Sequence, residues 1–216
     1  MIRLGHALKR VADIAVSAGA IVFLFLPFAA IALAIKLDDR GPVFFRQERI
    51  GRGSRRFRVW KLRTMIVNAA SQGLGNTVAS DDDRITRVGR SLRKFGVDEL
   101  PQILNVLSGE MSLVGPRPTL SYQVEQYDAT QRRRIEVRPG ITSFAVVSGR
   151  NALSWVERIE LDVWYIDHWS LGLDLRILLR TLWCVLVTHE GLYGKDGVND
   201  PFVDPNGEGK DDDRRD

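Results

Sequence analysis

Asp98 and Glu99 are two adjacent carboxylates within residues 96–102 (GVDELPQ), shortly before a proline. Pro101 biases Leu100 away from helical backbone angles, and its missing N–H costs nothing at the first position of a helix, so we predict that a helix begins there. The pair then lies at a helix entrance, where free N–H groups and the helix dipole favour anions. Basic residues lie on both sides in the sequence, which indicates chemistry on phosphate. Taken alone, an Asp-Glu pair is more often a solvated surface pair.

Transfer of a phosphoryl-linked group from a nucleotide diphosphate would suit this combination of residue types. Negative charge on the diphosphate repels an anionic nucleophile, so cationic side chains supply much of the catalysis. One carboxylate could act as the nucleophile and form an acyl phosphate. The adjacent carboxylate would repel it unless a divalent cation lies between them, and Mg²⁺ favours carboxylate and phosphate oxygens. Asp98, Glu99 and the nearby Arg residues could supply these parts, as a catalytic pair that also binds Mg²⁺, although the interpretation as a solvated surface pair stays open on these residues alone.

The element that would position this pair at a membrane is an uncharged stretch of 22 residues, 14–35. As a helix it would extend roughly 33 Å, enough to cross a bilayer. Charged residues follow it rather than a cleavage site, so we expect a retained membrane segment and not a signal peptide. Basic residues flank both ends, which draws both towards the cytoplasm, and Pro27 can bend the helix. A single span and a re-entrant helix that returns to the same face both remain open on these features.

A basic, strand-like region follows the apolar stretch. It holds eight basic residues and one acidic residue between positions 46 and 63. We predict two strands, residues 42–45 and 57–63, joined by a turn at residues 51–54. Such a run is typical of a solvated face or of a patch for anionic lipid head groups, and a share of it could bind substrate phosphate.

The remaining sequence predicts helices with few strands. We expect a helix over residues 85–94, a strand over 143–147, and a helix that begins at a capping box formed by Ser154 and Glu157. Asp174 could cap a last helix over 175–187, whose Trp and Arg residues suit either a soluble core or a membrane interface. The end of the chain is rich in Gly and Asp, typical of disorder. The fold class we expect is α+β, with short strands and amphipathic helices at the membrane interface.

Composition excludes several classes of protein. The net charge is +4, which favours an anionic partner without specifying it, and the single Cys184 excludes an internal disulfide. The three histidines are scattered, and the sequence contains no P-loop, dinucleotide-binding glycine motif, zinc-protease motif or nucleophile elbow. The basic run lacks the interleaved aromatic residues of a nucleic-acid binding surface, so we expect no nucleic-acid partner.

Several short motifs, in this order and density, resemble the small bacterial polyprenyl-phosphate phosphoglycosyl transferases, the monotopic enzymes that initiate glycan assembly. The resemblance covers residues 9–188. The motifs that carry it are KRVAD at 9–13, GPVFFRQERIG at 41–51, KLRTM at 61–65, RITRVG at 84–89, DELPQ at 98–102, LVGPRP at 113–118, RPGIT at 138–142 and GRN at 149–151.

The resemblance implies a re-entrant membrane helix within residues 1–40 that is broken near Pro27. Residues 41–190 would form a catalytic domain on the cytoplasmic face of the bacterial inner membrane, and residues 191–216 a disordered acidic tail. It implies that Asp98 attacks the β-phosphate of a UDP-sugar and releases UMP, while Glu99 helps to hold Mg²⁺. Polyprenyl (undecaprenyl) phosphate would then take the phosphosugar from Asp98. Membrane lipid and downstream glycosyltransferases are further expected partners.

By position, seven further residues match those of the family's active site and are expected to bind substrate or phosphate. They are Lys61, Arg63, Arg93, Arg117, Arg150, Asp162 and Asp174. Residues 143–146 and Ser148 depart from the family pattern, which we expect to affect sugar or nucleotide contacts rather than the reaction. A rival hypothesis is a non-catalytic membrane-anchored adaptor that binds anionic lipid or a partner enzyme. It predicts that Asp98→Asn is silent while the charge of the basic run matters.

Overall fold

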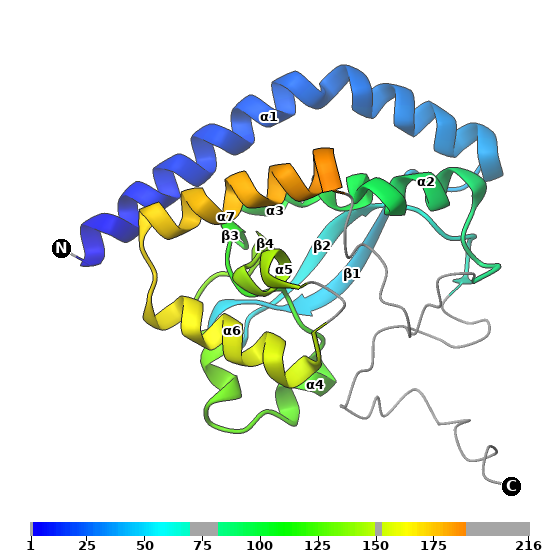
Figure 1. Cartoon of the computed structure of the whole chain (residues 1–216). Helices are drawn as coiled ribbons and strands as arrows, with labels where there is room; N and C mark the ends of the chain where they lie inside the picture. Colours follow the sequence, from blue (N-terminus) through cyan, green and yellow to red (C-terminus); the bar gives the residue numbers. More distant parts are fainter. Residues whose placement is uncertain (1, 70–81, 150–152, 189–216) are drawn as a thin grey trace, which may run out of the picture.

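The computed structural model describes residues 2–69, 82–149 and 153–188. These residues form an α+β fold that consists mostly of helices, with a few short strands (Figure 1). The expected acidic tail, residues 191–216, lies outside the described residues. The long N-terminal helix α1 (Ile2–Asp39) contains the whole uncharged stretch together with Pro27.

Helix α1 bends into an arch above the rest of the protein (Figure 1). A proline inside a helix removes one hydrogen bond and crowds the preceding turn, so a bend is the expected response. The helix is long and apolar enough to cross a membrane by length and composition. Apolar side chains along its middle are exposed, with Phe23 exposed to 88%. Such a surface is costly in water and is suited to lipid.

Both ends of α1 contact the same body of the protein. Near the N-terminal end, Arg10 donates hydrogen bonds to the carbonyl oxygens of Val106 (2.6 Å) and Leu107 (3.0 Å), which lie in the last turn of a helix. Near the C-terminal end, Ile35 is buried in an apolar cluster with Leu62. The arch is therefore attached at its two feet, while its middle stands clear.

Strands β1 (Phe44–Ile50) and β2 (Arg56–Leu62) pair antiparallel, with the short 3₁₀ helix η1 (Arg52–Ser54) between them. The predicted hairpin is confirmed. The first strand begins two residues later than predicted and continues to Ile50, where its N–H pairs with the carbonyl oxygen of Thr119. One face of β2, with Phe57 and Val59, packs into a core cluster with Val106 and Met111.

Helix α2 (Arg87–Phe95) ends at Gly96, which has φ 65° and donates its N–H to the carbonyl oxygen of Arg93. Glycine takes this left-handed conformation without strain, so the chain reverses there and a new helix can begin at once. The 3₁₀ helix η3 (Val97–Gln102) follows and continues into α3 (Ile103–Ser108). The prediction that a helix begins at Pro101 is wrong by one turn. Asp98 and Glu99 lie inside its first turn rather than before it.

The rest of the described chain forms a two-stranded parallel pairing and a set of helices. These elements are β3 (Ser112–Val114), α4 (Ser121–Glu125), η4 (Gln131–Ile135), β4 (Gly140–Thr142), α5 (Phe144–Ser148), α6 (Trp155–Asp167), α7 (Leu171–Trp183) and the π-helix η6 (Cys184–Thr188). The strand predicted over residues 143–147 is wrong. The Ser143 hydroxyl accepts a hydrogen bond from the N–H of Val146 at 3.1 Å and caps a short helix instead.

Capping residues determine where the helices α6 and α7 begin. The predicted capping box of Ser154 and Glu157 is confirmed at the start of α6. The prediction that Asp174 caps the last helix is wrong, because Ser170 is the cap and α7 begins at Leu171. Asp174 lies in the first turn of α7 and is buried.

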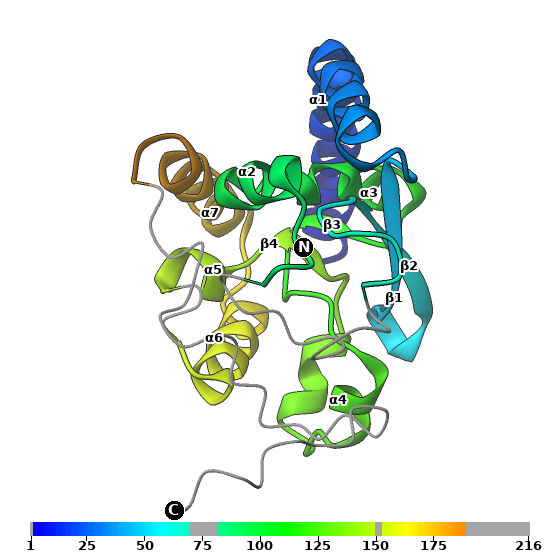
Figure 2. The same cartoon turned by 90° about the vertical axis from the view of Figure 1, so that its right-hand side faces the viewer.

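Helices α2, α3 and α7 lie at one level of the molecule, on the side from which α1 rises (Figures 1 and 2). Helices α4 and α6 lie at the opposite end (Figure 2). Helix α7 exposes apolar side chains, among them Leu175, Leu179 and Trp183. Helix α7, with its exposed apolar side chains, therefore lies at the level of the molecule from which α1 rises.

Candidate active site

Both oxygens of the Glu99 carboxylate accept hydrogen bonds from cations. The Lys61 ammonium donates to Oε1 at 2.8 Å, and Arg117 donates one terminal nitrogen to each oxygen, both at 2.6 Å. Two parallel guanidinium–carboxylate bonds are strong and fix the orientation of both groups. Burial alone would raise the pKa of Glu99, but the charges and hydrogen bonds of Arg117 and Lys61 hold it well below its usual range. Glu99 is therefore ionised at neutral pH.

Asp98 precedes Glu99 in η3 but has a different environment. Within the described residues, no side chain donates a hydrogen bond to its carboxylate. Burial and the negative charge of Glu99 raise the pKa of Asp98 to about 6, although Lys61 and Arg93 act in the opposite direction. At pH 7 such a group is mostly ionised. A half-buried, ionised carboxylate that forms no such bond is suited to act as a nucleophile.

Lys61 and Arg93 reach the carboxylate pair from two different elements. Lys61 is on β2, which packs against η3. Arg93 is on α2, where its Nε donates to the hydroxyl of Thr64 at 2.8 Å and its charge acts on Asp98. Arg63 follows β2 and forms a buried ion pair with Asp39, so its guanidinium is held at the C-terminal end of α1.

Arg117 extends from a loop that the parallel strands hold firmly. Gly115 donates its N–H to the carbonyl oxygen of Thr142 at 3.0 Å. A Cβ atom on Gly115 would lie 2.5 Å from the carbonyl oxygen of Arg138, so the loop has no room for a larger residue there. Prolines on both sides of Arg117 further restrict its backbone. This loop therefore presents the guanidinium to Glu99 in a fixed direction.

Asp162 lies in the middle of α6, where it is 1% exposed. It makes no bond to the clamp that Lys61 and Arg117 form on Glu99. It forms an ion pair with Arg134 at 2.7 Å. Although Asp162 does not bond to the carboxylate pair, its charge acts on the guanidinium of Arg117. The structure thus places Asp162 behind Arg117 rather than beside Asp98.

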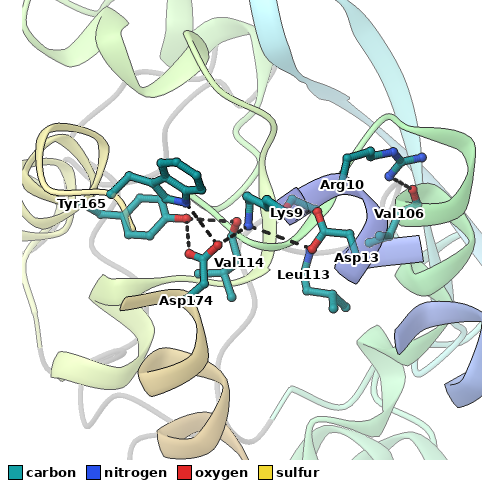
Figure 3. Close-up of polar contacts among 10 residues, drawn as sticks. Lys9, Arg10, Asp13, Val106, Leu113, Val114, Tyr165 and Asp174 are labelled. Atoms are coloured by element: carbon teal, nitrogen blue, oxygen red, sulfur yellow. Dashed lines mark hydrogen bonds and ion pairs between the residues drawn. The ribbon is translucent and has the colours of Figure 1, made fainter. Parts of the chain in front are cut away.

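Asp174 is held by three side chains at the N-terminal foot of α1. It accepts hydrogen bonds from Lys9 (2.6 Å), from the hydroxyl of Tyr165 (2.6 Å) and from the indole of Trp169 (3.1 Å). Figure 3 shows Lys9 pointing from α1 towards Asp174, with Asp13 beside it facing β3. Burial, together with the charge and hydrogen bond of Asp174, raises the pKa of Tyr165. In this structure Asp174 joins α7 to α1.

Arg150, the remaining residue expected to bind substrate, lies outside the described residues. Of the residues expected in the site, the structure gathers Lys61, Arg93, Asp98, Glu99 and Arg117. It places Arg63 and Asp174 at the two feet of α1. Sequence reasoning did not single out Arg134, because nothing in its local sequence distinguishes it from its exposed neighbours.

The oxygen chemistry of the pair fits a magnesium ion in part. Mg²⁺ is commonly held by one or two carboxylates together with phosphate oxygens. The Asp98 carboxylate is available, whereas three of the roughly four acceptor positions on Glu99 are used by Lys61 and Arg117. The described residues contain no cluster of three metal-ligating side chains. Any magnesium bound here would therefore rely on Asp98, on the remaining position of Glu99 and on oxygens of the substrate.

Comparison with known proteins gives the family. The sequence matches the model of the bacterial sugar transferase family over residues 4–188, which is most of the chain. The chain belongs to this family. The resemblance that the motifs carry is thereby confirmed.

Three relatives illustrate the match. The chain is 46% identical over 189 residues to an uncharacterized sugar transferase, EpsL, of Bacillus subtilis (strain 168), with 86% of this chain and 90% of the relative covered. It is 46% identical to the UDP-glucose:undecaprenyl-phosphate glucose-1-phosphate transferase of Caulobacter vibrioides, covering 83% of this chain and 70% of the relative. It is 43% identical to the galactosyl transferase CpsE of Streptococcus agalactiae, covering 83% of this chain and 42% of that longer protein.

Proposed function

We propose that this protein transfers a sugar phosphate from a UDP-sugar to a polyprenyl phosphate such as undecaprenyl phosphate, the first membrane step in assembling a glycan. An oxygen of the Asp98 carboxylate attacks the β-phosphorus, and the bond from that phosphorus to the bridging oxygen breaks. UMP leaves with the bridging oxygen and its electron pair. A phosphate oxygen of the polyprenyl phosphate then attacks the same phosphorus and releases Asp98 as a carboxylate.

The observation that carries this proposal is the unequal treatment of two adjacent carboxylates. Glu99 is bonded by Lys61 and Arg117, whereas the Asp98 carboxylate receives no side-chain hydrogen bond from the described residues. Two neighbouring acids in different environments commonly have different roles. The bonded carboxylate holds the cations in place, and the other remains available to form a bond. Those same cations can neutralise the diphosphate as charge develops on it.

The proposed site also requires a lipid substrate, and α1 supports this. Its apolar middle would lie in the membrane, and because both of its feet bond to one body, we propose a re-entrant helix. Positive-inside flanks favour the cytoplasmic face of the bacterial inner membrane. Helix α7 and its neighbours would lie in the interface, among lipid head groups. Arg63, beside the C-terminal foot, is buried in its ion pair with Asp39 and so holds that foot to the end of β2.

Magnesium would be held by Asp98, by Glu99 and by diphosphate oxygens, and it would neutralise charge on the phosphates. The remaining cations, Lys61, Arg93 and Arg117, would orient the diphosphate in line with Asp98. The polyprenyl diphosphate sugar that results would be the substrate of glycosyltransferases that act next.

A burst experiment tests this proposal. The purified full chain in nanodiscs is mixed with each of a panel of UDP-sugars and Mg²⁺, first without and then with polyprenyl phosphate. We expect release of one UMP per protein without the lipid and continuous turnover with it. Mass spectrometry of the peptide that contains Asp98 should show an added sugar phosphate. Chelation of the metal should remove the burst, and added Mg²⁺ should restore it.

The variants separate the possible outcomes. Asp98→Asn should abolish the burst and lower turnover by at least about 10³-fold, because an amide cannot form the intermediate. Asp167→Asn, which alters an exposed ion pair, is the matched control. Turnover that requires both substrates together, without any burst, would overturn the covalent route. Absence of UMP release from every UDP-sugar would overturn the transferase assignment and favour the adaptor.

A further inference from the structure

Arg134 and Asp162 form the most completely buried ion pair among the described residues. Their side chains are 3% and 2% exposed. Arg134 belongs to η4, and it donates Nε at 2.9 Å to the Oδ2 oxygen of Asp162 on α6. The other oxygen, Oδ1, is buried and has no hydrogen-bond partner within the described residues. This pair lies outside the set of groups that the proposed reaction uses.

The pair is linked to Arg117 through the backbone. Arg134 donates NH1 to the hydroxyl of Tyr127 at 2.5 Å and makes a long contact of 3.5 Å from NH2 to the carbonyl oxygen of Arg117. Its guanidinium thus lies under the loop whose side chain clamps Glu99. Burial acts to lower the pKa of Arg117, but the charges of Glu99, Asp98 and Asp162 together raise it. Asp162 therefore acts on Arg117 both through Arg134 and through its own charge.

Stability alone is a weak reason for such a pair. Removing two charges from water costs several kcal/mol per ion, and replacing a buried pair with apolar residues of similar volume is often neutral or stabilising. A second ion pair, Arg133 with Asp167 at 3.1 Å, already joins η4 to α6 at the surface. Since the exposed pair connects the same two elements, a role specific to the buried pair must come from what it touches. What it touches is the loop of Arg117.

We propose that Asp162 and Arg134 are positioning residues for the transfer proposed above. They hold the Arg117 loop so that its guanidinium meets Glu99 in the bidentate arrangement. Asp162 acts through Arg134 and Arg117 and does not contact the substrate. This inference rests on the proposed function. UMP release by the parent protein is therefore measured first, as a test of that function.

The decisive variant replaces both charges with apolar residues, Arg134→Met together with Asp162→Leu, so that no charge is left buried alone. We expect a folded protein whose thermal unfolding midpoint is close to that of the parent. Its kcat/KM for UDP-sugar should fall by about 10-fold to 100-fold, because a misplaced catalytic group costs that much even when the fold is intact. Asp162→Asn should lower kcat/KM by a factor in the same range. Asp167→Asn, on the matched pair at the surface, should leave kcat/KM unchanged.

Repeating the Asp162→Asn change in an Arg117→Ala protein distinguishes a positioning role of Asp162 from direct contact with the substrate. If Asp162 acts through Arg117, then in an Arg117→Ala protein the further change Asp162→Asn lowers kcat/KM by less than about 2-fold, since coupled residues are not additive. A full additional loss there would mean that Asp162 contacts the substrate, and it would overturn the inference. Parent-like kcat/KM in the folded double variant would also overturn it. Absence of activity in the parent would instead refute the proposed function, so the two failures are distinguishable.

Discussion

Two regions of this molecule collect hydrogen-bond donors around a carboxylate, and they do so for different purposes. In η3, Glu99 accepts from Lys61 and Arg117. At the N-terminal foot of α1, Asp174 accepts from Lys9 and from two aromatic side chains. Both residues were expected to belong to the site. A carboxylate surrounded by donors is therefore not, by itself, the mark of a catalytic centre.

The difference lies in the neighbours. Glu99 has Asp98 beside it, a carboxylate that receives no side-chain hydrogen bond from the described residues. Asp174 has no such neighbour, and one of its donors, Lys9, lies on α1, so that this bond closes the contact between α1 and α7 (Figure 3). Loss of donors at the first region should alter catalysis, and loss at the second should alter stability.

Of these two carboxylates, Glu99 should have the larger effect on catalysis. The change Glu99→Gln leaves Lys61 and Arg117 without a charged partner and releases the orientation of the guanidinium. We expect kcat/KM for UDP-sugar to fall on the order of 10²-fold, the scale on which positioned charges contribute to catalysis. Steady-state kinetics of UMP release would measure it. Parent-like kcat/KM in this variant would contradict the idea that the clamp serves the reaction.

A stability effect is expected at Asp174. The change Asp174→Asn leaves Lys9 mostly buried without its closest anion, although Asp13 at 4.0 Å compensates in part. We expect a loss of about 2–3 kcal/mol in the free energy of unfolding. Thermal unfolding in nanodiscs, followed by tryptophan fluorescence, would measure it.

Kinetics of the same variant sharpen the comparison. Per folded molecule, the fall in kcat/KM for Asp174→Asn should be much smaller than for Glu99→Gln. A raised KM with unchanged stability would indicate that Asp174 binds substrate, as its position in the family pattern suggested. Lys9→Met should reproduce the stability loss from the other side of the bond.

The smallest effect is expected at Glu157, a solvent-exposed carboxylate that accepts hydrogen bonds. Glu157 accepts hydrogen bonds from the backbone and hydroxyl of Ser154, which lower its pKa. A lowered pKa stabilises the fold above the ordinary pKa of Glu, and this contribution is lost as the pH falls through the lowered value. Ser154→Ala should lower the unfolding midpoint by about 2–4 °C at pH 7.

The pH dependence completes this prediction. The difference between Ser154→Ala and the parent should shrink at pH values below the lowered pKa of Glu157, because the carboxylate is then protonated in both proteins. The carboxyl carbon shift of Glu157, followed by NMR during an acid titration, would report the pKa directly. The variant keeps the backbone donor of residue 154, so the outcome that would contradict the capping-box explanation is a parent protein in which the pKa of Glu157 is not lowered.

Local patterns in the sequence determined much of the architecture. The length of the uncharged stretch predicts α1, the glycine turn predicts the hairpin, and Ser154 with Glu157 predicts the start of α6. These features depend on neighbouring residues, whose effects are visible in the sequence. The family motifs also indicate Asp98 and Glu99 as a pair and the basic residues expected around them.

Tertiary structure alone decided which charges meet. Glu99 is bonded from β2 and from the loop after β3, and no local rule distinguishes it from Asp98. The same holds for Arg134, which is buried against Asp162 while its neighbour Arg133 is only half-buried. A buried ion pair depends on elements that are distant in the chain and on the loss of water between them. The sequence thus determines which residues are available, and packing determines which carboxylate is held and which remains available to react.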